Sequence, residues 1–215
     1  MSNQLTWKSA VHSKAFIVQL VVTIMALLTI LLTLPYYFHS VIGPKPGLQL
    51  QDPILNLFTP QDFSVLIFTL IYLSLFIVLW GLINKPYGIA LGLGSYLVIT
   101  IVRTITMYVF TLEPPTGIIV LQDPFIDRVA YGGNVFTKDL FFSGHVATLT
   151  LLGLVEERPW AKKSVLSCAV IVGILIIIQR VHYTIDVVAA PFITYGIVKL
   201  FNQFLKKAIQ TERGS

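Results

Sequence analysis

The stretch "AFIVQLVVTIMALLTILLTLPYYF", residues 15–38, contains no charged side chain. A helix rises about 1.5 Å per residue and a bilayer core is roughly 30 Å thick, so about 20 such residues are enough to cross a membrane. Further apolar stretches follow it along the chain, and together they predict six transmembrane helices near residues 15–38, 63–83, 87–112, 140–155, 164–178 and 183–204. The fourth and fifth are short, which suits helices tipped into a site that opens below the membrane surface.

The composition supports an all-α integral membrane protein. Of the 215 residues, 55% are hydrophobic and only 12% are charged, and the mean hydropathy is +0.81. A soluble domain is much less apolar than this. We therefore expect one transmembrane domain over residues 1–215. The isoelectric point of about 9.3 does not indicate nucleic-acid binding, because excess Lys and Arg in a membrane protein usually marks its cytoplasmic face.

The basic residues predict the orientation of the six helices. If both termini lie on one side, that side holds ten of the fifteen Lys and Arg residues and the other side holds five. The positive-inside rule then places both ends in the cytoplasm, with tails at residues 1–14 and 205–215. The five basic residues expected outside are Lys45, Arg103, Arg128, Lys138 and Arg180.

The stretch "HYTID" at residues 182–186 carries the first candidate catalytic pair. His182 and Asp186 are four positions apart, so on a helix they share one face, one turn from each other. Asp186 would then accept a hydrogen bond from one ring nitrogen of His182 and leave the other nitrogen free. This arrangement is typical of an oriented histidine nucleophile.

A second candidate group lies in "FFSGHVATLT", residues 141–150. His145 is suited to protonate a leaving alcohol, because its ordinary pKa is near neutrality. Ser143 and Gly144 fall where the fourth helix begins, and Ser is a favoured N-cap at a helix end that binds phosphate. Arg103 is suited to neutralise phosphate oxygens. With Asp139, these charged and imidazole groups all map to the outer half of the predicted bundle.

Other interpretations of the same residues remain open. A metal site built from His145, His182 and Asp186 is a legitimate ligand set. Tyr108, Tyr131 and Tyr183 suit either an aromatic cage for a quaternary amine or an interfacial tyrosine belt. The outer-loop acids Glu113, Asp123 and Asp127 suit either a cationic head group or ordinary solvation.

Three stretches resemble the type 2 phosphatidic acid phosphatase (PAP2) superfamily, in the branch that contains the sphingomyelin synthases. They are "VRTITMYVFTLEPP" at 102–115, "KDLFFSGHVATLTLL" at 138–152 and "HYTIDVVAAPFIT" at 182–194. The resemblance implies a six-helix bundle whose site faces away from the cytoplasm. It implies His182 as nucleophile, Asp186 as its orienting group, His145 as general acid and base, and Asp139 as a supporting acid.

The chain departs from the phosphatase branch at two points. The Lys-x6-Arg-Pro motif of that branch is absent, and Ile176 stands six residues before His182, where the phosphatases carry Arg. A phosphomonoester dianion needs more positive charge around it than a phosphodiester monoanion. The sequence therefore favours phospholipid head-group chemistry over phosphatidate dephosphorylation.

The predicted function is a lipid phosphotransferase of the sphingomyelin synthase type. A phospholipid would donate its head group through a phosphohistidine intermediate to ceramide or another lipid alcohol, with no metal or cofactor. Glu113, Tyr108 and Tyr183 are the head-group candidates. Hydrolysis, with water as acceptor, is the nearest alternative, and a non-enzymatic lipid-binding protein with a degenerate site is the alternative from another class. The identities of the lipids, the membrane and the oligomeric state do not follow from the sequence.

Overall fold

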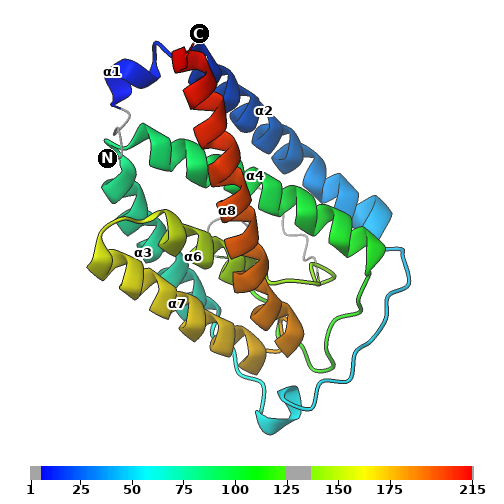
Figure 1. Cartoon of the computed structure of the whole chain (residues 1–215). Helices are drawn as coiled ribbons and strands as arrows, with labels where there is room; N and C mark the ends of the chain where they lie inside the picture. The colour runs from blue at the N-terminus through cyan, green and yellow to red at the C-terminus, as the bar shows by residue number, and fades with distance from the viewer. Residues whose placement is uncertain (1–5, 124–136, 215) are drawn as a thin grey trace.

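The computed structural model describes residues 6–123 and 137–214, and helices dominate both ranges (Figure 1). An isolated bridge between Leu48 and Leu112 joins two loops. The helices are α1 (Trp7–Ala10), α2 (Lys14–Tyr37), the π-helix η1 (Phe38–Ile42), the 3₁₀ helix η2 (Leu55–Leu57), α3 (Ser64–Leu82), α4 (Pro86–Val109), α6 (Gly144–Val155), α7 (Pro159–Ile178) and α8 (Thr184–Gly214).

Five helical segments are long and apolar enough to cross a membrane, which confirms the predicted helical membrane bundle. They cover Lys14–Ile42, Ser64–Leu82, Pro86–Val109, Pro159–Ile178 and Thr184–Gln210. α2 lies at the edge of the bundle, since only 11% of its most apolar window is buried inside the protein. Its outward side chains are apolar, as lipid contact requires.

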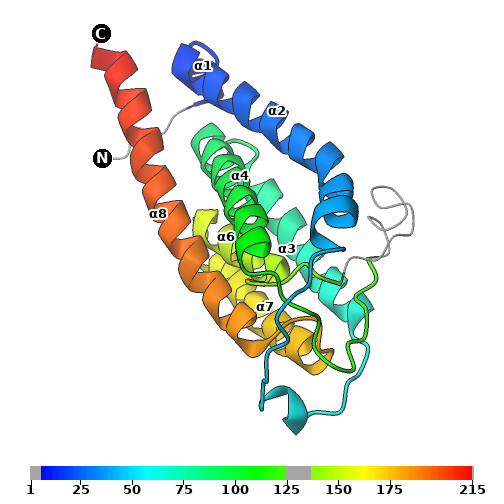
Figure 2. The same cartoon turned by 90° about the vertical axis from the view of Figure 1, so that its right-hand side faces the viewer.

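The fourth predicted span is the short helix α6, which has 12 residues. Most of its side chains are buried, and it packs against α3, α4, α7 and α8. Figures 1 and 2 both place it in the interior of the bundle. A helix surrounded by protein need not match the thickness of the bilayer, so twelve residues are enough here.

The two ends of the described chain meet at one end of the bundle. Ala10 and Phe16 share a buried cluster with Ala90 of α4 and with Leu205 and Ile209 of α8. The connections 43–63 and 110–123 gather at the opposite end (Figure 2). The two ends of the chain therefore lie together, as the charge count assumed, while the cytoplasmic assignment of that end stays a prediction.

The sequence-based helix boundaries differ most from the structure in α6, α7 and α8. α7 begins at Pro159 rather than 164, because Pro is favourable at the first helical position and Lys162 and Lys163 continue the helix. α8 runs to Gly214 instead of ending at 204. The fourth helix begins at Gly144 instead of 140, because Ser143 caps it and Phe141 adopts a φ of 116°, which no α-helix contains.

The connector between α7 and α8, residues 179–183, holds together the 43–63 and 110–123 connections. Gln179 is fully buried; its amide accepts from Phe63 N at 2.9 Å and donates to Ser64 Oγ at 3.0 Å and to Ile119 O at 3.3 Å. Its main-chain carbonyl accepts from Ile119 N at 3.1 Å. This one side chain therefore joins the start of α3 to the 110–123 connection.

Arg180 continues the same role in a left-handed conformation, with φ of 59°. Its guanidinium donates to the carbonyls of Thr116 at 2.8 Å, Leu55 at 3.2 Å and Phe58 at 3.3 Å. The Arg180 guanidinium is thus bound to loop carbonyls, and the connector joins the 43–63 and 110–123 connections.

We expect Gln179→Leu to destabilise the bundle, because a buried group that loses its hydrogen-bond partner costs about 1–3 kcal/mol. Thermal unfolding of the detergent-solubilised protein should show a clear drop in midpoint. Gln203→Leu, a matched change at an exposed position of α8, should leave the midpoint nearly unchanged. Equal midpoints for the two variants would contradict the role of Gln179.

Candidate active site

The N-terminus of α6 forms one wall of the candidate site. Ser143 is its N-cap, as predicted, and the Ser143 hydroxyl accepts from Val146 N at 3.5 Å. Ser143 is fully buried. The cap fixes the first turn of α6, which carries both His145 and the main-chain N–H groups that have no partner within the helix.

Arg103 of α4 lies directly against this helix end. A side chain at Gly144 would bring its Cβ to 2.2 Å from Nη1 of Arg103, so only glycine leaves room for the guanidinium. Arg103 Nε donates to Phe142 O at 3.2 Å, and Nη2 donates to Asp139 Oδ1 at 2.5 Å. The glycine of the "SGH" motif thus allows the cation to lie over the α6 N-terminus.

Asp139 forms an ion pair with Arg103 at the edge of the site. Burial by itself would raise the pKa of the Asp139 carboxyl. The charge of Arg103 and the hydrogen bond from its guanidinium outweigh burial and hold that pKa below its ordinary value. Asp139 therefore stays ionised and fixes the direction of the guanidinium.

His182 and Asp186 meet at the start of α8, as their spacing predicted. His182 Nδ1 is 3.4 Å from Asp186 Oδ2, and both side chains are almost fully buried. The same carboxylate oxygen accepts from Tyr183 N at 3.3 Å. Asp186 is the third residue of α8, and its carboxylate accepts a hydrogen bond from the main chain of the residue before the helix, as in a capping box.

A main-chain hydrogen bond links the two helix ends. Ser143 N donates to Asp186 O at 3.1 Å. The N-cap of α6 and the first turn of α8 are therefore held together directly, which sets His145 relative to the His182–Asp186 pair. Gly173 of α7 permits the close packing behind them, since a Cβ there would be 2.8 Å from Val187.

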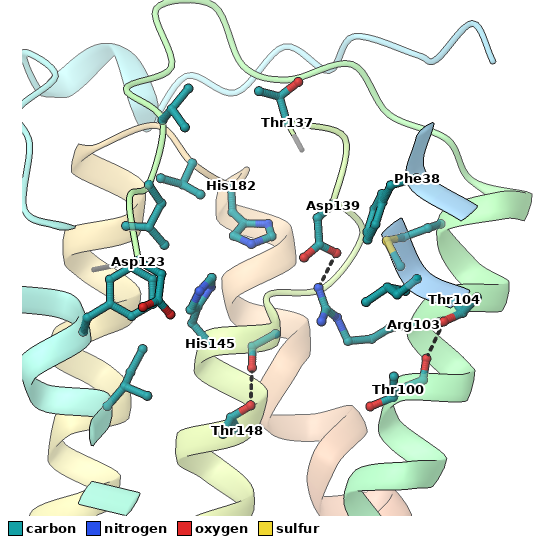
Figure 3. A pocket seen from close by; sticks show the side chains of 18 of the residues that line it. Phe38, Thr100, Arg103, Thr104, Asp123, Thr137, Asp139, His145, Thr148 and His182 are labelled. Carbon is teal, nitrogen blue, oxygen red and sulfur yellow. Dashed lines mark hydrogen bonds and ion pairs between the residues drawn. The ribbon is translucent and has the colours of Figure 1, made fainter. Parts of the chain in front are cut away.

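One pocket of about 410 Å³ collects these groups (Figure 3). Arg103, Asp139, Gly144, His145 and His182 all line it, and Figure 3 shows both imidazoles directed into the same space. Asp186 lies behind His182, and Ser143 lies behind the α6 end. Apolar side chains of α2, η1 and α3 continue the wall, including Leu34, Phe38, Ile71 and Leu75.

The opposite wall of the pocket holds Asp123 and Tyr72, a pair that the sequence motifs did not predict. Asp123 is buried and accepts from the Tyr72 hydroxyl at 2.7 and 2.8 Å. The ring of Phe68 lies edge-on to His145 at 5.8 Å between centroids. Figure 3 places Asp123 on the other side of His145 from Arg103. Only the folded chain shows this, because α3 carries no recognisable motif.

The three head-group candidates lie outside the pocket lining. Glu113 binds Lys138 Nζ at 2.8 Å and Gly47 N at 2.9 Å, contacts that lower the pKa of its carboxyl. Tyr183 is buried, and its hydroxyl donates to Glu113 O at 2.9 Å and accepts from Leu50 N at 3.2 Å. The ring of Tyr108 packs under Lys45 Nζ at 3.9 Å. Tyr131 and Asp127 lie outside the described residues.

The described side chains contain no group of three or more His, Cys, Asp or Glu residues placed to hold a metal ion. Instead, two buried polar atoms at the site have no hydrogen-bond partner among the described residues. They are His145 Nδ1 and Asp186 Oδ1. Buried polar atoms are normally paired, so these atoms mark the site as one built for further polar contacts.

Fold and site together define an all-helical membrane protein with two histidines and an arginine around one pocket. Residues 138–203 match the family model described as PAP2 superfamily C-terminal, which confirms the resemblance for the part of the chain that carries Asp139, His145, His182 and Asp186. Phosphatidylinositol:ceramide inositolphosphotransferase 3 from Arabidopsis thaliana is 39% identical over 95 residues. That match covers 42% of this chain and 31% of the relative, so it spans about a third of the relative's length.

The Arg103–Asp139 pair predicts a pH-dependent part of the stability. Because the pKa of Asp139 is lowered on folding, ionised Asp139 stabilises the fold above its unfolded pKa of about 3.9, and this contribution is lost as the pH falls through the folded pKa. In detergent, wild-type protein should unfold at a higher temperature than Asp139→Asn at pH 7, and the difference should shrink below about pH 4.

Glu157→Gln serves as the control, because Glu157 pairs with Lys85 while 61% of its side chain is exposed. Exposed pairs contribute only about 0–1 kcal/mol, so this variant should differ little from wild type at either pH. A difference for Asp139→Asn that stayed constant down to pH 3 would contradict the assignment.

Proposed function

We propose that this protein is a lipid phosphotransferase that moves a phosphate-linked head group from a glycerophospholipid to ceramide or another lipid alcohol. The observation that carries the proposal is the meeting of His145, in the first turn of α6, and His182, in the connector before α8, beside Arg103 in one pocket. Asp186 behind His182 supplies the orienting carboxylate. The similarity to an inositolphosphotransferase over 95 residues supports the same reaction class.

The first half-reaction uses His182 as the nucleophile. Asp186 accepts a hydrogen bond from Nδ1–H of His182, which keeps the proton on Nδ1 and leaves the lone pair of Nε2 free to attack phosphorus. The phosphorus–oxygen bond to diacylglycerol breaks, and His145 gives its proton to the departing oxygen. The head group is then carried on His182 as a phosphohistidine.

The second half-reaction reverses the proton transfer. His145, now neutral, takes the proton of the acceptor hydroxyl, and the acceptor oxygen attacks the phosphohistidine. The bond to Nε2 breaks and His182 is regenerated, so the donor and acceptor use one site in turn, which predicts ping-pong kinetics. Water as the acceptor would give hydrolysis by the same residues.

Charge within the pocket supports a phosphodiester as the substrate. Arg103 is the cation that lines it among the described residues, and Arg180 is bound to loop carbonyls instead. Asp123 faces the pocket beyond His145, where a carboxylate suits head-group hydroxyls or a cationic amine. We infer that the phosphate lies near Arg103 and the rest of the head group extends toward Asp123.

The first test uses purified protein in liposomes with head-group-labelled phosphatidylinositol, phosphatidylcholine or phosphatidylethanolamine, with and without ceramide, and labelled phosphatidate in parallel. We expect label to appear on ceramide, and His182→Ala to reduce its appearance by more than about a thousandfold. His39→Ala, an exposed histidine in η1, should behave as wild type. Label released into water regardless of ceramide, or phosphate released from phosphatidate, would contradict transfer.

The general-acid role of His145 can be separated from the nucleophile. With a natural diacylglycerol leaving group, His145→Ala should slow the first half-reaction by about 10²–10⁴-fold. With a p-nitrophenyl head-group diester, whose leaving oxygen needs no proton, single-turnover release should recover most of that loss. His182→Ala should fail with both donors. An equal loss with both donors for His145→Ala would exclude the acid role.

Gly144→Ala should displace the Arg103 guanidinium, because the added Cβ would lie 2.2 Å from Nη1. We expect turnover to fall at least about tenfold, as expected for one misplaced charge-assisted contact of 1.4 kcal/mol or more. Gly196→Ala in α8, where nothing lies within 4 Å, is the matched control and should keep full activity. Normal turnover in Gly144→Ala would show that the close approach of Arg103 is dispensable.

A further inference from the structure

The residue before α8 does not provide the side-chain cap that a helix N-terminus usually has. A helix N-terminus leaves main-chain N–H groups without intrahelical partners, and the residue before the helix normally accepts from one of them through a short polar side chain. Here that residue is Tyr183, whose hydroxyl reaches away to Glu113 O and Leu50 N. Tyr183 therefore cannot cap the helix that it precedes.

Asp52 supplies the missing acceptor from the long loop between α2 and α3. Its Oδ2 accepts from Thr184 N, the first residue of α8, at 2.6 Å. Its Oδ1 accepts from Ile54 N at 3.0 Å, which fixes the carboxylate within its own loop. A carboxylate is also the charge that a helix N-terminus favours. The two partners are 132 positions apart in the chain.

The turn that Asp52 holds is the one that carries the site. His182 precedes it, Asp186 lies within it, and the Nδ1–Oδ2 distance between them is 3.4 Å. That distance is long for a hydrogen bond, and such bonds weaken steeply when length or angle worsens. Asp186 O also holds Ser143 N at 3.1 Å, so a shift of this turn would move both histidines relative to each other.

We propose that Asp52 is a positioning residue, which fixes the first turn of α8 and through it the His182–Asp186 pair. Asp52 does not line the pocket that holds the two histidines; it lines a separate groove beside Tyr183 and Ile185. Its effect on turnover rests on the proposed function, whereas its effect on the α8 turn does not.

The experiment compares Asp52→Ala, Asp52→Asn and Asp62→Ala with wild type in liposomes. Asp62 is a matched control, because it accepts from Ser64 N at 2.9 Å and from the Ser64 hydroxyl at 2.6 Å at the start of α3, on the same end of the bundle. Hydrogen exchange of peptides that cover 183–190 reports the α8 turn, and steady-state turnover gives kcat and KM separately.

We expect Asp52→Ala to speed exchange in 183–190 by about fivefold or more, because the loss of one helix cap lets this turn open more often, and to lower kcat with little change in KM. Asp52→Asn keeps an acceptor oxygen, so its exchange rate in 183–190 and its kcat should both be close to those of the wild type. Asp62→Ala should leave exchange in 183–190 and kcat close to wild type.

Unchanged exchange in 183–190 for Asp52→Ala would overturn the proposal whatever the activity. Faster exchange with an unchanged kcat would also overturn it, because the turn would then not control the site. If Asp52→Ala does not fold, Asp52→Ser decides by the same readouts, because a single shorter hydroxyl cannot keep both contacts of the carboxylate. Absence of turnover by the wild type would remove the proposed function alone, and the exchange comparison would still decide whether Asp52 fixes the turn.

Discussion

The rest of the structure depends on the complete enclosure of α6 by other helices. Because α3, α4, α7 and α8 surround it, a helix of 12 residues is stable in the middle of a membrane bundle without spanning it. Its N-terminus consequently lies inside the protein, at the end of the bundle that carries the 43–63 and 110–123 connections. A buried helix end needs acceptors for its N–H groups. The Ser143 hydroxyl accepts from one of them, and the Arg103 guanidinium, which is itself a donor, makes the adjoining pocket suited to an anion that would accept from the others.

Each charged group at the site has a partner that holds it in one direction. Asp139 fixes Arg103, Asp186 fixes His182, and Ser143 N fixes the main chain of Asp186. This order matters for phosphoryl chemistry, where catalysis comes mainly from prepositioned charge rather than from movement of protein groups. His145 is the contrast, since its Nδ1 has no partner among the described residues, which suits a group that exchanges a proton with two successive oxygens.

Local patterns in the sequence predicted the parts of the site that depend on neighbouring residues. The four-residue spacing predicted the His182–Asp186 contact, and the preference of Ser for helix ends predicted the Ser143 cap. The early start of α7 was missed because Lys162 and Lys163 look like a loop until Pro159 is seen as a first helical residue. The Asp52–Thr184 and Gln179–Phe63 contacts had no local signal, since each joins positions more than a hundred residues apart. The head-group candidates were predicted from their side-chain chemistry and their positions near loops. In the structure, the side chains of Glu113 and Tyr183 form hydrogen bonds with neighbouring loops instead of lining the pocket.

The connector 179–183 contacts the 43–63 and 110–123 connections mostly through their main chain. Its partners include the carbonyls of Thr116, Leu55, Phe58 and Glu113 and the amides of Leu50, Phe63 and Ile119. Main-chain partners persist when a side chain is exchanged, but they move when a residue is inserted or removed. The connector therefore constrains the lengths of these loops more than it constrains their side chains.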